Sequence, residues 1–150
     1  MPDGLLGMGF SQISVFHTSP VFQTMVSNGA VTQEVFGFAL SSESGKSELT
    51  IGGTNTNMYQ ESTIEYVSVS LAAYWQIPLA GLTRPGLDGS PDVVVVDKTS
   101  YAQSIVDTGS TLIITSDSTA QAFYANVTGA KPSTEIGGGT WSGMSSRGTA

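Results

Sequence analysis

Residues 104–114 read Ser104-Ile105-Val106-Asp107-Thr108-Gly109-Ser110-Thr111-Leu112-Ile113-Ile114. Two apolar runs typical of short strands enclose a tight polar loop with a single acid. This pattern places a carboxylate at a rigid, otherwise hydrophobic turn, where it can accept hydrogen bonds from the backbone amides of Gly109 and Ser110. Thr108 can anchor the loop, and Gly109 leaves room for close approach. Taken alone, Asp-Thr-Gly is equally compatible with an ordinary Asx turn in a hairpin.

Outside this stretch, the hydrophobic pattern predicts a mostly β fold. Apolar residues alternate over residues 35–40 and again over 49–53, with a polar turn around Ser44-Gly45 between them, which indicates a hairpin. Short turns rather than helical crossovers join the strands, so we expect antiparallel sheets. Further strands are predicted at residues 4–10, 64–71, 74–79, 92–97, 101–106 and 111–115.

Two short helices are predicted as well. The first follows Ser19-Pro20, with Ser19 as N-cap and Pro20 as first helical residue, and ends at Asn28-Gly29. The second lies between Ser116 and Val127, where apolar residues recur at helical spacing behind a Ser/Asp cap.

The composition fits one folding unit, or a piece of a larger one, of an acidic protein. The chain has 150 residues, of which 11% are charged, and a net charge of −7. Soluble domains typically have about 25% charged residues. The negative charge would repel a phosphate backbone, so we do not expect nucleic-acid binding. No apolar run reaches the roughly 18 residues that a membrane span needs, and the first residues do not resemble a signal peptide.

Several common site types do not fit. The chain has no cysteine and one histidine, so neither a thiolate nor a histidine-rich metal site is expected, and no cofactor is predicted. Asp88, Asp92 and Asp97 lack calcium-loop spacing. Gly45-Lys46-Ser47 ends like a phosphate loop, but Leu40 stands where that motif needs glycine.

The 104–114 stretch resembles the second active-site loop of the pepsin-like aspartic proteases, in which Asp-Thr-Gly lies between hydrophobic runs. The resemblance continues in order along residues 3 to about 142, and the small, cysteine-free composition is similar to that of fungal secreted members. The other segments that carry it are Asp3-Gly4-Leu5-Leu6-Gly7-Met8-Gly9, Ser19-Pro20-Val21-Phe22, Leu49-Thr50-Ile51-Gly52-Gly53-Thr54, Tyr59, Tyr66-Val67-Ser68-Val69 and Tyr74-Trp75-Gln76-Ile77.

This resemblance implies a bilobal fold and peptide-bond hydrolysis by a water activated between two aspartates, one from each lobe. It implies that Asp107 is the catalytic acid of the second lobe. Thr108 and Gly109 would support its loop, and Ser110 and Thr111 would lie close to a polypeptide substrate. Two nearby carboxyls share one proton because they cannot both ionise. Family members need no cofactor, and the expected location is extracellular or vacuolar.

The chain departs from the family pattern, most of all in its catalytic pair. No second Asp-Thr-Gly or Asp-Ser-Gly occurs, and the first-lobe loop and flap should precede Asp3. We therefore expect a central fragment that is inactive alone and lacks a first-lobe segment. Residues 1–60 would end the first lobe, 61–142 would form the inter-lobe strands and start the second, and 143–150 would be an unstructured tail.

Two alternatives stay open. The chain could be an inactive β-rich peptide-binding protein or pseudoenzyme that keeps part of a peptide cleft. It could also assemble as two chains that pair two copies of Asp107 across a two-fold axis.

Two further features do not depend on catalysis. Asn126-Val127-Thr128 satisfies the N-glycosylation pattern at the end of the second helix, so Asn126 is a candidate acceptor if the protein is secreted. The strand aromatics are expected to belong to the core rather than to a binding site, since they alternate within strands. They are Phe36, Phe38, Tyr74 and Trp75.

Overall fold

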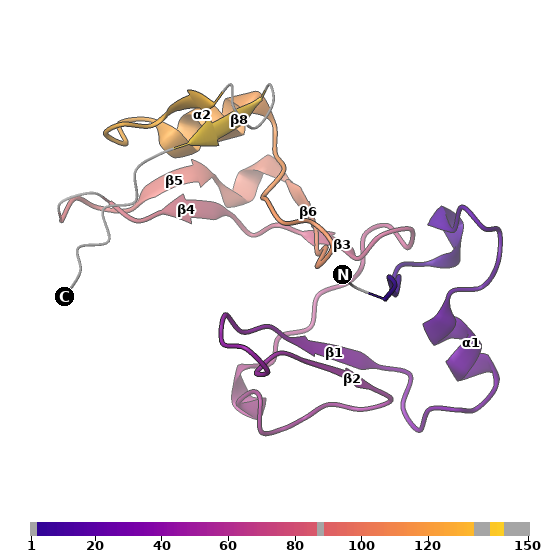
Figure 1. The fold of residues 1–150 in the computed structure, drawn as a ribbon. Coiled ribbons are helices and arrows are strands. Elements are labelled where there is room, and N and C mark those ends of the chain that lie inside the picture. Colours follow the sequence, from indigo (N-terminus) through magenta and orange to yellow (C-terminus); the bar gives the residue numbers. More distant parts are fainter. Residues whose placement is uncertain (1–2, 87–88, 134–138, 143–150) are drawn as a thin grey trace. The chain divides into compact units, whose positions relative to one another are not determined.

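The computed structural model describes residues 3–86, 89–133 and 139–142 (Figure 1). The chain divides into two compact units, Met1–Ile77 and Pro78–Ala150. Most regular elements are strands, and the described residues form two α-helices, which confirms the predicted mostly β class. No helix in these ranges is both long and apolar enough to span a bilayer. The tail predicted at residues 143–150 lies outside the described residues.

The first unit contains the predicted first helix, with a different start. Helix α1 spans Val21–Ser27, and its N-cap is Pro20 rather than Ser19, with no side-chain capping bond. Its end is as predicted: Gly29 has φ +64°, a conformation that glycine adopts without strain. The Ala30 amide donates to the Met25 carbonyl (2.9 Å), which gives a Schellman ending.

The predicted hairpin of this unit is confirmed. Strand β1 (Phe36–Ala39) pairs antiparallel with β2 (Glu48–Ile51), and Phe36 lies opposite Ile51. The Gly52 amide extends the pairing by donating to the Val35 carbonyl (2.9 Å). The remaining elements of the unit are two 3₁₀ turns, η1 (Ser11–Ile13) and η2 (Glu61–Thr63), and strand β3 (Gln76–Pro78), which reaches the boundary.

A chain of aromatic rings forms the core of the first unit. Phe36 packs against Phe22 (centroids 4.9 Å apart) and against Trp75 (5.3 Å), both edge to face, and Phe10 packs on Trp75 (4.6 Å). The Trp75 indole N–H donates to the Met8 carbonyl (2.8 Å), which satisfies its polar edge. Phe36 and Trp75 therefore belong to this aromatic cluster, although each is only half-buried. Two other predicted core aromatics are only partly covered, since Phe38 and Tyr74 are each 42% exposed.

The second unit contains a hairpin, a helix and a further short hairpin. Strand β4 (Leu82–Arg84) pairs antiparallel with β5 (Val93–Val96). Helix α2 (Asp117–Tyr124) begins as predicted, because the Ser116 hydroxyl accepts from the Thr119 amide (3.2 Å). The 3₁₀ turn η3 (Lys98–Ser100) precedes strand β6 (Gln103–Ile105). Strands β7 (Lys131–Ser133) and β8 (Thr140–Ser142) pair antiparallel and were not predicted.

Arg84 connects two elements of the second unit. Its side chain is only 7% exposed, and its Nη2 donates to the carbonyl of Ala125, the C-cap of α2 (3.1 Å), while Nη1 donates to the Pro85 carbonyl (3.1 Å). A cation at this end of a helix is favourable because the last carbonyls carry partial negative charge. Arg84 therefore fixes the end of α2 against β4, a role that the hydrophobic pattern of the sequence did not reveal.

Three predicted strands do not form in the described part of the chain. Residues 4–10 and 111–115 contain no strand, and residues 64–71 contribute only an isolated bridge between Leu71 and Gln76. Several of their apolar side chains face solvent: Leu5 is 100% exposed and Ile113 is 90% exposed. A strand needs a neighbour along its whole length, and in the described residues these segments make only scattered backbone bonds, from the Phe10 amide to the Ala73 carbonyl (3.4 Å) and from the Ser70 amide to the Gln76 carbonyl (2.8 Å).

Candidate active site

The loop after β6 holds the carboxylate of Asp107 by both of its oxygens. Oδ1 accepts from the Gly109 backbone amide (2.9 Å), and Oδ2 accepts from the Ser110 hydroxyl (2.7 Å). The Ser110 amide also donates to the Asp107 carbonyl (3.4 Å), which closes the turn. All three residues are exposed. The geometry therefore presents a fixed, solvent-facing carboxylate, with its orientation set by its own loop.

Gly109 is needed here for space rather than for an unusual backbone angle. Its φ lies outside the left-handed region, but a Cβ at this position would lie 3.1 Å from Asp107 Oδ1. Such a contact would force the carboxylate to shift by a few tenths of an ångström. The small residue allows the backbone amide to approach the acid closely.

The same two bonds favour the ionised form of the acid. The Ser110 hydroxyl, and after it the Gly109 amide, lower the pKa of Asp107 from its ordinary value of 3.8, against a smaller opposing effect of desolvation. Because the pKa of Asp107 is lower in the folded chain than in the unfolded chain, ionised Asp107 stabilises the fold at pH values above its ordinary pKa. This contribution is lost as the pH falls through the lowered pKa. Because the group is fully exposed, solvent keeps this contribution small.

Asp97 shows that hydrogen bonding alone does not identify a catalytic acid. It too is exposed, and its pKa is lowered by the Thr99 side chain, the Thr99 amide and Ser100. However, Asp97 accepts three hydrogen bonds on Oδ1, at 2.6 to 3.1 Å, where it caps η3. Asp107 has one donor on each oxygen and caps no helix. What distinguishes the two acids further is the Asp-Thr-Gly motif.

The remaining predicted site residues are less tightly held. Thr108 and Thr111 are exposed and make no hydrogen bond to any residue in the described ranges, so the loop brings together Asp107, Gly109 and Ser110 only. The apolar residues on either side of the loop are exposed as well: Val106 is 57% exposed and Leu112 is 59% exposed. Among the described residues, the loop is therefore held by its own hydrogen bonds and not by apolar packing of its flanks.

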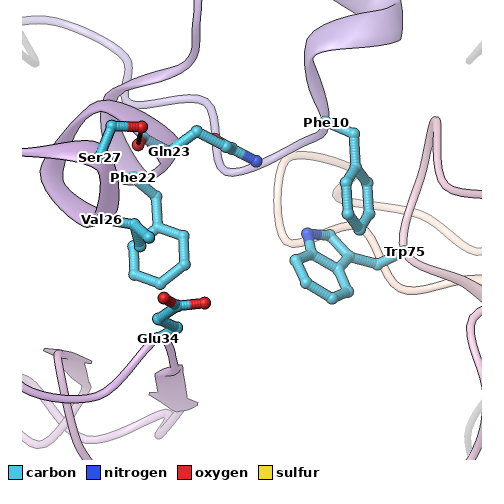
Figure 2. A pocket seen from close by; sticks show the side chains of 7 residues that line it. All are labelled: Phe10, Phe22, Gln23, Val26, Ser27, Glu34 and Trp75. Carbon is cyan, nitrogen blue, oxygen red and sulfur yellow. Dashed lines mark hydrogen bonds between the residues drawn. The ribbon is translucent and has the colours of Figure 1, made fainter.

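A pocket of about 320 Å³ lies in the first unit, and none of the predicted site residues lines it. Figure 2 shows helix α1 on one side of it and the Phe10–Trp75 pair on the other, with Glu34 at its edge. Its lining residues are Phe10, Phe22, Gln23, Val26, Ser27, Glu34 and Trp75. It is an opening beside the aromatic core, and it contains no group suited to peptide hydrolysis beyond the single carboxylate of Glu34.

No cluster of three or more potential metal-binding His, Cys, Asp or Glu side chains occurs within the described ranges. The site that these ranges do offer consists of one oriented carboxylate in a hydrogen-bonded loop. Such a group can act as a general base or share a proton with a second carboxyl.

Comparison with known proteins assigns the class. Residues 1–142 match the sequence profile of the family described as eukaryotic aspartyl protease, so the chain belongs to that family. The pepsin-like resemblance of the sequence is thereby confirmed.

Individual relatives agree with this assignment. An aspartic protease of Phaffia rhodozyma is 30% identical over 141 residues, which cover 94% of this chain. Pepsin A of Canis lupus familiaris is 32% identical over 111 residues, and cathepsin D of Clupea harengus is 40% identical over 115 residues, each covering 74% of the chain. The matched region spans 32% of the fungal protein and 27% of the other two, so the chain corresponds to about a third or less of these relatives.

Proposed function

We propose that this chain is part of an aspartic endopeptidase and that Asp107 is one of its two catalytic carboxyls. The observation that supports this most is the loop itself: in a member of the aspartyl protease family, the acid of the Asp-Thr-Gly motif is held by Gly109 on one oxygen and Ser110 on the other. These bonds favour the ionised carboxylate, the form that can accept a proton from water.

The proposed reaction is hydrolysis of a polypeptide by a water held between two aspartates. One carboxylate takes a proton from the water, while the other, protonated, polarises the peptide carbonyl. In this chain Asp107 supplies one carboxyl, with Ser110 and Gly109 fixing its orientation. Thr108, which makes no hydrogen bond within the described ranges, is not assigned the supporting role that the resemblance implied, and Thr111 is proposed to lie next to the substrate. No metal or cofactor takes part in the proposed steps.

The second carboxyl is proposed to come from a first-lobe segment outside these 150 residues, so that the chain alone is inactive. The sequence has a single Asp-Thr-Gly and no Asp-Ser-Gly, and its relatives are about three times longer. We assign residues 1–60 to the end of the first lobe and 61–142 to the inter-lobe strands and the start of the second. The whole protein would act outside the cell or in a vacuole.

A second candidate is an inactive β-rich peptide-binding protein or pseudoenzyme. The single Asp-Thr-Gly motif favours it, because one carboxyl cannot be base and electrophile together. The two candidates differ in one measurable respect. A pseudoenzyme would bind peptide but would stay without cleavage activity even when a family first lobe completes the molecule.

Titration of Asp107 by NMR tests the proposed loop. In the isolated chain, we expect the Asp107 carboxyl to titrate in a single step with a pKa below 3.8, and Ser110→Ala to raise that pKa because the largest stabilising bond is lost. Thr99→Ala is the matched control: it should raise the pKa of Asp97 and leave that of Asp107 unchanged.

Two results would count against the loop. An Asp107 pKa that does not respond to Ser110→Ala would show that the loop does not hold the acid as described. Two widely separated steps at Asp107 in the isolated chain would instead indicate a dyad between two copies.

A further inference from the structure

The Asn126-Val127-Thr128 triplet lies in a turn that the catalytic proposal does not use. It is the only Asn-x-Ser/Thr triplet in the sequence. Helix α2 ends at Tyr124, and the backbone then reverses, with Asn126 at φ +60°. The Val127 amide donates to the Tyr124 carbonyl (3.1 Å), and the Ala130 amide donates to the Val127 carbonyl (3.0 Å). The triplet therefore occupies a defined, hydrogen-bonded turn.

This turn exposes the two side chains that define the triplet. Asn126 and Thr128 are exposed, whereas Val127 between them is half-buried. Within the described ranges, no hydrogen bond engages the Asn126 amide group. Arg84 holds the carbonyl of the preceding residue, Ala125, at 3.1 Å. The buried cation thus fixes the backbone just before Asn126, and the amide nitrogen is left accessible.

We propose that Asn126 is an N-glycosylation site, an inference that rests on the proposed passage of the protein through the secretory pathway. The co-reactant is an oligosaccharide carried on a lipid diphosphate. A bond forms between Asn126 Nδ2 and C1 of the first sugar, the C1–O bond to the diphosphate breaks, and Nδ2 loses one proton. The lipid diphosphate leaves, and no oxidation or reduction occurs. Thr128 supplies the hydroxyl that defines the acceptor triplet.

An asparagine at position 126 could also be needed for the backbone conformation of the turn, and the test must distinguish this role from glycosylation. Asn tolerates the left-handed conformation better than other side chains except glycine, so Asn126 could serve the turn alone. Thr128→Ala resolves this ambiguity, because it removes the acceptor triplet and keeps Asn126. Thr128→Ser is the conservative variant, because it keeps both the hydroxyl and the triplet.

The experiment expresses residues 1–150 behind a cleavable secretion signal in a eukaryotic host, with the mobility of the chain measured before and after N-glycosidase treatment. We expect one glycan, removed by the enzyme, lost in Asn126→Gln and Thr128→Ala, and kept in Thr128→Ser. Ala30→Thr is the positive control. It creates a second triplet at Asn28, which is also exposed at the end of a helix, and should add a second glycan.

Because the signal is supplied, the outcome does not depend on the protein's own route or on its catalytic role. Cleavage of the signal, read from the N-terminal mass, reports that the chain has reached the lumen. A chain with a cleaved signal and no glycan overturns the proposal, as does a glycan that persists in Thr128→Ala. Either result leaves the proposed function of Asp107 standing. Conversely, if Asp107 proved not to be catalytic, the glycan at Asn126 would still be expected.

Discussion

Replacing Asp107 by asparagine is expected to lower peptide cleavage roughly 10⁴-fold or more in a complete bilobal enzyme, because loss of one member of a concerted catalytic unit costs orders of magnitude. Asparagine has nearly the same shape and keeps an oxygen that can accept from Gly109. It cannot take a proton from water. The expected loss is therefore in kcat, with little change in the structure of the loop.

A chimera makes this measurement possible. The segment of this chain that matches cathepsin D of Clupea harengus, 40% identical over 115 residues, would replace the corresponding part of that protein. A cooperative thermal transition, measured for the parent chimera and for each variant, reports that they have folded. Asp97→Asn is the matched control, because Asp97 is also exposed and hydrogen-bonded and its pKa is also lowered. This variant should leave cleavage unchanged.

Two outcomes would contradict the assigned role of Asp107. One is a folded chimera in which Asp107→Asn cleaves peptide at the parent rate. The other is an equal loss in Asp97→Asn, which would indicate a general effect of removing negative charge from the unit.

Residues 1–150 expressed alone are expected to be only marginally stable, with a weak and broad thermal transition. Among the described residues Phe22 is the one buried apolar side chain, at 8% exposure, whereas Leu5, Ile113 and Ile114 are 85% to 100% exposed. Folded domains hold only about 5–15 kcal/mol in reserve, and each large apolar side chain left in water forfeits roughly 1.5–3 kcal/mol. Leaving several such side chains in water is therefore enough to offset most of this free energy of unfolding.

Hydrogen exchange locates the weak places. We expect fast exchange at Ile105, Val106 and Leu112, whose side chains are about half exposed or more, and association of chains through unpaired strand edges at higher concentration. The opposite pattern would disprove the fragment interpretation. It consists of a sharp thermal transition in a monomer, with those three amides among the slowest to exchange.

Local signals in the sequence predicted the elements that are stabilised locally. The 35–53 hairpin has both of its strands and its turn within one short stretch, and β1 and β2 formed in the predicted place. Helix α2 began where Ser116 provides its own cap. The bonds to Asp107 from Gly109 and Ser110 were predicted in part for the same reason, because donor and acceptor lie within three residues of each other.

Features that depend on distant partners could not be predicted in this way. Residues 4–10, 64–71 and 111–115 have strand-like patterns, but a pattern does not provide a neighbouring strand, and in the described structure they form no regular strand and only one isolated bridge. Arg84 was overlooked because its partner, the Ala125 carbonyl, lies 41 residues away. The β7–β8 hairpin was missed because Pro132 and several glycines obscure its alternation.

The most direct test of the central claim is a peptidase assay of residues 1–150 alone at pH 3 to 6, over a series of protein concentrations. If Asp107 is one of two catalytic carboxyls and the other lies on a separate first lobe, the isolated chain should show no cleavage at any concentration. The claim would be contradicted by pepstatin-sensitive cleavage that is lost in Asp107→Asn. A rate proportional to protein concentration would make the chain a complete enzyme, and a rate rising with its square would assign the second carboxyl to another copy.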